Sequence, residues 1–165
     1  MARRAAFTAA LILFCVALQF SAARWARIAG VEPDLLLLLT AIIGLLSGPR
    51  AGMATGFSAG VLEGALLGRW IGIYAATKTL IGFLAGEAGG RLFVENLLVI
   101  MGVVAIMTLV NEGLLGIFAR SAGHGWWRPV LLGLGQAAYN AALALAVGAA
   151  LRRVRRFLPP EEPRA

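Results

Sequence analysis

The stretch that decides the fold is SGPRAGMATGFSAGVLEGALLGRWIGIYAATKTLIGFLAGEAGG, residues 47–90. Its first half places seven glycines four residues apart: Gly48, Gly52, Gly56, Gly60, Gly64, Gly68 and Gly72. Residues four apart share one face of a helix, so this row is a face almost without side chains, against which a second helix can pack closely in lipid. In water each glycine would cost about 1 kcal/mol relative to alanine. The row therefore predicts a helix in a bilayer, where unpaired backbone groups enforce helical structure.

The second half of the stretch predicts a partner helix for this row. After the turn at Gly68-Arg69-Trp70 the chain is apolar again, and it carries Lys78. Glycines again follow at intervals of four, so a cation lies beside a second face with few side chains. The glycines that we expect to pack helices together are Gly52, Gly56, Gly60, Gly64, Gly82 and Gly86.

Composition places the chain among polytopic membrane proteins. Of its 165 residues 60% are hydrophobic and 14% charged, and the mean hydropathy is +0.84. The net charge is +7, but the basic residues flank apolar segments, which indicates topology signals and lipid contacts rather than nucleic-acid binding. We expect a single transmembrane domain, residues 1–158, and a polar C-terminal tail, residues 159–165. The single cysteine, Cys15, lies in an apolar run and allows no internal disulfide.

Six apolar segments predict an all-α integral membrane protein with six transmembrane helices, since a helix needs about 20 residues to cross the hydrocarbon. The expected spans are residues 5–23, 35–46, 51–67, 71–89, 96–118 and 130–151. The first could also be read as a signal peptide, but no soluble domain follows it for export, so we take it as a span.

An even number of spans puts both termini on one side. Cytoplasmic termini place nine arginines inside and five outside, as the positive-inside rule requires. The inner arginines are Arg3, Arg4, Arg50, Arg91, Arg152, Arg153, Arg155, Arg156 and Arg164, and the outer ones are Arg24, Arg27, Arg69, Arg120 and Arg128.

Polar residues gather in the outer half of the predicted spans. Glu63 precedes Trp70 by seven residues and Lys78 follows it by eight, so both lie roughly 10–12 Å below the outer interface. The further polar residues at comparable depth are Gln19, Glu112, Gln136 and Asn140. Charged groups inside a membrane are costly and are functional candidates by default.

Three interpretations of these polar residues remain open. The first is a structural ion pair, either Glu63 with Lys78 or Lys78 with Glu112. The second is an outward-facing polar cavity between helices, lined by the same residues together with Gln136 and Asn140. The third is a proton-coupled acid at Glu63 or Glu112.

Motifs of enzymes and metal sites are missing from the sequence. It has no phosphate-binding loop, no nucleophile elbow, no His-Glu-x-x-His and no cysteine pair. The single histidine, His124, lies among loop glycines and gives no metal site. We therefore expect no catalytic residue, no cofactor and no metal. The arginine run 152–156 is expected to contact anionic lipid.

The hairpin and the segment before it resemble the MreD family, small integral membrane proteins of bacterial rod-shape determination. The matching residues are Pro33-Asp34-Leu35, Gly48-Pro49, Gly52, Gly56-Phe57, Gly60, Leu62-Glu63, Gly72-Ile73-Tyr74-Ala75 and the run from Lys78 to Gly86. The family favours aspartate where this chain has Glu63.

This resemblance implies a fold and a function. The implied fold is a six-helix bundle similar to the substrate-binding subunits of energy-coupling-factor vitamin transporters. The implied role is non-enzymatic, in the inner-membrane complex that builds the lateral cell wall. MreC is the implied direct partner, and MreB, RodA and a penicillin-binding transpeptidase belong to the same assembly.

The alternative function is a substrate-binding subunit of a vitamin-type transporter. In that case Glu63, Lys78 and Glu112 would line the solute pocket. A proton-coupled exporter built around Glu63 is a more distant possibility.

Overall fold

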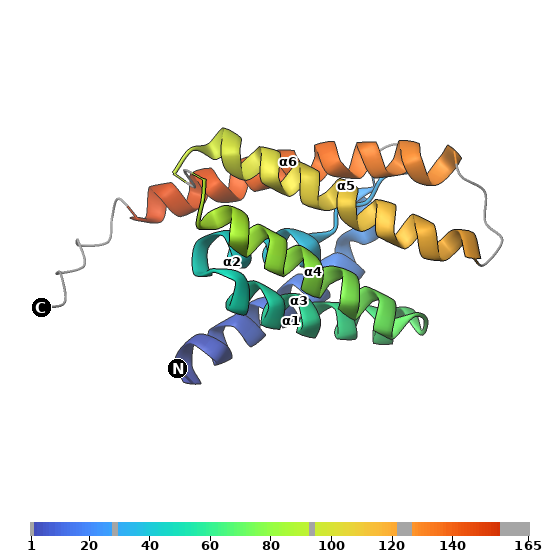
Figure 1. Cartoon of the computed structure of the whole chain (residues 1–165), viewed down its shortest axis with the longest axis horizontal. Helices are drawn as coiled ribbons and strands as arrows, with labels where there is room; N and C mark the ends of the chain where they lie inside the picture. The colour runs from blue at the N-terminus through green and yellow to red at the C-terminus, as the bar shows by residue number, and fades with distance from the viewer. Residues whose placement is uncertain (1, 28–29, 93–94, 122–126, 156–165) are drawn as a thin grey trace, which may run out of the picture.

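The computed structural model of the chain describes residues 2–27, 30–92, 95–121 and 127–155. Six α-helices follow one another in this part of the chain and form an all-α bundle (Figure 1). They are α1 (Ala2–Ala26), α2 (Leu35–Ser47), α3 (Pro49–Leu67), α4 (Ile71–Gly89), α5 (Leu97–Ser121) and α6 (Trp127–Arg155). Each segment predicted as a span is helical. The expectations for His124, Arg156 and the tail lie outside the described residues.

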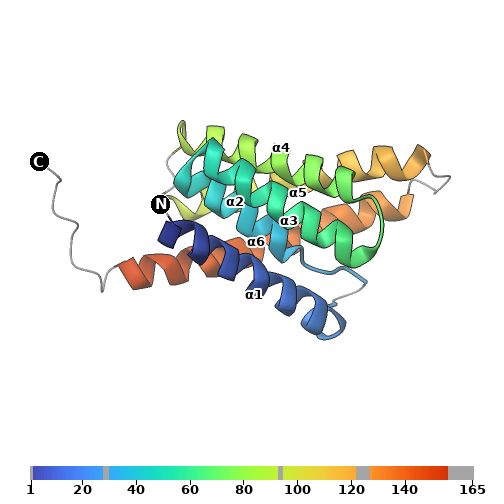
Figure 2. The same ribbon diagram turned by 90° about the horizontal axis from the view of Figure 1, so that it is seen from below.

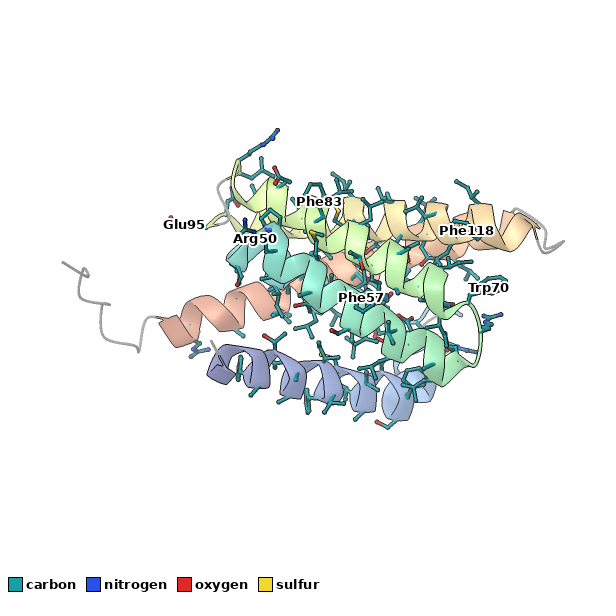
Figure 3. All side chains as sticks on the ribbon, turned by 60° about the horizontal axis from the view of Figure 1, so that its bottom comes forward. Arg50, Phe57, Trp70, Phe83, Glu95 and Phe118 are labelled. Atoms are coloured by element: carbon teal, nitrogen blue, oxygen red, sulfur yellow. The ribbon has the colours of Figure 1, made fainter. Side chains whose placement is uncertain are left out.

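Successive helices run in alternating directions, so the start of α1 and the end of α6 lie at the same end of the bundle (Figures 1 and 2). Arg50 and Glu95 lie at this end as well, whereas Trp70, in the turn between α3 and α4, lies at the opposite end (Figure 3). We refer to the latter as the Trp70 end.

Within the residues that the structure describes, two helices are long and apolar enough to cross a membrane. The qualifying segments are Leu97–Phe118 in α5 and Leu131–Ala150 in α6, and shorter apolar helices cover Ala6–Ser21 and Leu35–Ser47. Most of each long segment faces outward, with only 28% and 33% of its apolar stretch buried. A core helix of a soluble protein would instead be mostly buried. The outside of the bundle is apolar elsewhere too, with Phe57 on α3 and Phe83 on α4 both exposed (Figure 3).

The α3–α4 pair is held by direct backbone contact along the glycine face. A methyl group added at Gly56 would collide with the carbonyl group of Lys78, and one added at Gly52 would collide with the carbonyl group of Gly82. The remaining glycines of the expected packing set also lie against a backbone, Gly60 and Gly64 at the start of α4, Gly82 at Gly52 and Gly86 at Pro49. These contacts leave no room between the two helices for any side chain.

The row of seven glycines is not one continuous face. Gly48 and Gly68 have φ angles of +87° and +66° and stand at the two ends of α3, where a left-handed conformation favours glycine. Gly72 belongs to α4, and a methyl group added there would meet nothing within 4 Å. The four-residue spacing of glycines therefore extends beyond the packing face. Gly48 and Gly68 form the turns at the ends of α3, and Gly72 makes no close contact.

The non-helical segment that precedes α2 lies against other helices of the bundle. With 13 residues, α2 is only about 20 Å long, too short to cross the hydrocarbon alone. A non-helical segment precedes it and runs along α6, where Val31 packs on Gly135. Non-helical backbone at membrane depth is tolerated only when protein or a cavity surrounds it.

The main apolar core surrounds α2. Leu37, Ala41 and Leu45 of α2 pack with Ile81 of α4 and Val104 of α5. Because this core also includes Ala144 of α6, it contains side chains from four helices and fixes α2 against both the α3–α4 hairpin and the α5–α6 pair.

Replacing Gly56 with alanine tests the backbone contact. We expect Gly56→Ala to lower the free energy of unfolding by about 1–3 kcal/mol, because the new methyl group forces α3 and α4 apart. Thermal unfolding of the purified protein in detergent measures the change.

The matched control is Gly102→Ala in α5, where nothing lies within 4 Å of the added group. This variant should be as stable as the parent or more so, because alanine favours helix over glycine by about 1 kcal/mol. Equal melting temperatures for the two variants would contradict close packing at Gly56.

Candidate functional site

Three charged side chains meet inside the bundle, and we call them the Lys78 cluster. The Nζ atom of Lys78 lies 2.5 Å from Oδ2 of Asp34 and 2.9 Å from Oε2 of Glu63. Lys78 is fully buried, and Asp34 and Glu63 are 5% and 7% exposed. Pairing is essential here, since an unpaired buried charge would be strongly destabilising.

The glycine face of α3 sets the geometry of this cluster. Gly56 lies against the backbone of Lys78, so the two helices are as close as their backbones allow at this level. Glu63 follows Gly56 by seven residues, or about two turns, and therefore lies on the same face of α3. The short interhelical distance lets a glutamate on α3 reach the ammonium group of a lysine on α4.

Asp34 has two functions, because it is also the N-cap of α2. Its Oδ1 atom accepts a hydrogen bond from the amide of Leu37 at 2.8 Å, while Oδ2 binds Lys78. An aspartate at a helix N-terminus is stabilised both by this cap and by the positive end of the helix dipole. One carboxylate thereby joins the start of α2 to the middle of α4.

The other free amides at the start of α2 are satisfied by side chains from distant helices. Gln19 Oε1 on α1 accepts from the amides of Leu35 and Leu36, at 2.9 and 3.2 Å. Asn140 Oδ1 on α6 accepts from the amide of Asp34 at 3.0 Å. The first amides of any helix lack partners within the helix, and in hydrocarbon no water can replace them.

The polar contacts continue to α5. Asn140 Nδ2 donates to Oγ1 of Thr108 at 3.1 Å, and that hydroxyl group donates to the carbonyl oxygen of Val104 at 2.9 Å. Every helix therefore contributes to one connected polar layer. Its members, in chain order, are Gln19, Asp34, Glu63, Lys78, Thr108 and Asn140.

Glu112 and Gln136 lie apart from this layer. They line a cavity of about 450 Å³, which we call the Glu112 cavity. Its lining residues are Arg27, Gly30, Val31, Glu32, Glu112, Leu132 and Gln136. The structure thus places Glu63, Lys78 and Asn140 together and separates them from the other two expected site residues.

The sequence suggested two possible ion pairs for Lys78. The structure contains the pair with Glu63, and among the described residues it shows no pair of Lys78 with Glu112. Asp34 is the partner that sequence reasoning missed, since it was not among the polar residues expected inside the spans. A signal was present: the residues from Arg27 to Asp34 contain Pro33, and extended chain advances about 3.3 Å per residue. Such a segment can carry Asp34 well below the interface.

The chemistry available to the polar layer is limited. In the part of the chain that the structure describes, no group of three or more His, Cys, Asp or Glu side chains is placed to hold a metal ion. Lys78 is occupied by two carboxylates, and the amide and hydroxyl groups bind one another or the backbone. The layer therefore joins helices to each other.

Comparison with known proteins identifies a family for this chain. A family model described as rod shape-determining protein MreD matches residues 1–121, nearly three quarters of the chain. The matched part ends with α5 and contains the whole Lys78 cluster. No curated protein and no solved structure matches the chain.

Removing the buried cation should be the most damaging single change in the cluster. We expect Lys78→Met to destabilise the protein by about 3–5 kcal/mol, because Asp34 and Glu63 are then left facing each other without a counter-ion. Glu63→Gln should cost less, since the Lys78–Asp34 pair remains. Unfolding in detergent should rank the variants in this order, and an equal loss for both would contradict it.

The role of Gln19 can be tested separately. Gln19→Leu removes the acceptor of two buried amides, each worth about 1–3 kcal/mol when left unpaired. We expect faster hydrogen exchange at Leu35 and Leu36 and a lower melting temperature. Ser21→Ala, on the exposed side of α1, is the control and should change neither.

Proposed function

The chain belongs to the MreD family of rod shape-determining proteins, and from this premise we propose that it is a non-enzymatic membrane subunit of the complex that builds the lateral wall of rod-shaped bacteria. In this role it binds MreC and supports peptidoglycan synthesis indirectly. Its contribution is a rigid surface in the membrane.

The observation that carries this proposal is the closed polar layer. The side chains of Asp34, Glu63 and Lys78 are buried and form two ion pairs through the ammonium group of Lys78, so the charged groups of the cluster are not offered to a ligand. The outside is apolar, with side chains such as Leu98 and Leu131 exposed by 65% and 68%. A protein with a locked interior and an apolar exterior suits docking of a partner's membrane helix.

We further propose that all six helices cross the inner membrane in a bundle similar to energy-coupling-factor substrate-binding subunits, with both termini in the cytoplasm. The common position of the start of α1 and the end of α6 supports an even number of crossings (Figures 1 and 2). Arg50 at that end, and Trp70 in the turn at the other, fit a basic cytoplasmic side and an aromatic outer interface (Figure 3).

MreC is the proposed direct partner, through its single membrane helix. MreB, RodA and a penicillin-binding transpeptidase are proposed members of the same assembly. Helix pairing in lipid depends on side-chain packing rather than on the hydrophobic effect, so the docking face must be complementary in shape.

The transport alternative has less support from the geometry. It requires Glu63 and Lys78 to line a solute pocket together with Glu112. Lys78 is instead fully buried between two carboxylates, and of these three residues only Glu112 lines the cavity. The interior cluster is therefore better explained as part of the scaffold.

Site-directed crosslinking tests the proposed partner and locates its docking face. In a Cys15→Ala background, single cysteines would replace exposed residues on four helices, namely Phe14, Phe57, Ile106 and Leu134. We expect disulfide or bifunctional crosslinks to cysteines in the membrane helix of MreC from one face of the bundle and none from the opposite face. Crosslinks at no position, together with failure to co-purify, would contradict the proposed contact.

Complementation in bacterial cells tests the proposed role in cell shape. In cells depleted of their own MreD, the parent chain and Glu87→Gln, at a half-buried position on α4 outside the Lys78 cluster, should restore rod shape. Lys78→Met should leave cells round because the bundle is destabilised. Rod-shaped growth without any copy of the chain would remove the basis for the proposed role.

A further inference from the structure

The Glu112 cavity is a feature that the proposed scaffold role leaves unused. Its volume of about 450 Å³ lies within the range of small-ligand pockets, roughly 300–1,000 Å³. One wall is the connection between α1 and α2, with Arg27, Val31 and Glu32, and the other wall is formed by α5 and α6.

Glycines on α6 leave the space that the side chain of Glu112 occupies. A methyl group added at Gly133 would lie 3.2 Å from Cβ of Glu112, so a larger residue there would push the glutamate aside. Gly135 similarly receives Val31 from the α1–α2 connection. Two glycines thus bring α6 close to both other walls while leaving the volume between them open.

The charges of the lining do not balance. Arg27 and Glu32 form an ion pair at the exposed mouth, with Nε of Arg27 2.7 Å from Oε1 of Glu32, and so neutralise each other. Glu112 has no cationic partner among the described ion pairs, and its contact is the amide nitrogen of Asn111 at 3.2 Å. The lining therefore carries one uncompensated negative charge when Glu112 is ionised.

Gln136 adds an amide group to the lining. The residue before Glu112, Asn111, is not part of the lining, but it is fully buried and its Oδ1 atom has no hydrogen-bond partner within the described structure. A carboxylate and an amide oxygen that face the same cavity are complementary to a group that has several N–H donors and a positive charge.

We propose that the Glu112 cavity binds an organic cation bearing a primary ammonium group. Glu112 is its counter-ion, Gln136 a hydrogen-bond acceptor, and Val31 and Leu132 contact the adjoining aliphatic carbons. A bare divalent metal ion does not fit, because Glu32 is paired with Arg27 and the one unpaired carboxylate, Glu112, gives too few oxygen ligands for such an ion. The ammonium group can belong to a soluble alkylamine or to the headgroup of an aminophospholipid, since the lining residue Arg27 directly follows the end of α1.

Binding to the purified full-length protein in detergent tests this proposal. One arm titrates 1,4-diaminobutane and follows the melting temperature, and the other adds phosphatidylethanolamine or phosphatidylglycerol and counts bound lipids by native mass spectrometry. We expect saturable binding in at least one arm, with phosphatidylethanolamine preferred over phosphatidylglycerol if the source is lipid. Saturation by the diamine alone would support the same site with a soluble ligand.

Matched variants then locate the binding. Glu112→Gln should weaken it at least tenfold, because the ion pair is lost, whereas Glu87→Gln, far from the cavity on α4, should not change it. If Glu112→Gln does not fold, Gln136→Leu provides a second test and should weaken binding while the melting temperature without ligand is kept.

Two results would overturn the proposal. One is the absence of binding in both arms, and the other is equal binding by the parent and both cavity variants. If neither amine binds but Glu112→Gln abolishes co-purification with MreC, the cavity receives a protein side chain instead. That outcome rejects the small-cation site and leaves the scaffold role intact, because the two proposals do not depend on each other.

Discussion

The buried start of α2 is the constraint on which the rest of the bundle depends. A helix that begins inside a membrane protein exposes its first amides where no water can reach them. Here four successive amides, from Asp34 to Leu37, receive three side-chain acceptors: Gln19 from α1, Asp34 itself and Asn140 from α6. The negative charge used for capping then requires a cation, which Lys78 supplies from α4. A local backbone problem is thus solved by residues spread over most of the chain.

The glycine face makes this solution possible. Lys78 satisfies two carboxylates only because α3 and α4 approach until Gly56 contacts the backbone of Lys78. Bulkier residues on α3 would move Glu63 away and leave a buried acid without its partner. Close packing and charge pairing are therefore two parts of one arrangement, and a change in either affects the other.

Much of the secondary structure could be predicted from the sequence, whereas the depth and rotation of the helices could not. The ends of α2, α3 and α4 follow from local signals such as Asp34, Gly48 and Gly68, so their positions agree with the structure within a few residues. The pairing of Lys78 with Asp34 was missed because depth was counted as if every helix began at the interface. Gln136 and Asn140 lie one turn apart and were expected to act together. Packing of the α1–α2 connection on α6 instead directs one to the cavity and the other to the polar layer.

The position of Asn140 on α6 indicates whether α6 folds together with the five helices before it. The family match ends with α5, and Asn140 lies beyond it on α6. Yet its side chain accepts from the amide of Asp34 and donates to Thr108, both inside the matched region and both buried. Without α6 the buried amide of Asp34 would lose this acceptor, which costs about 1–3 kcal/mol, and Thr108 would keep only its bond to Val104. We therefore infer that α6 folds as part of the same unit as the five helices before it, because the cap of α2 is complete only when α6 is in place.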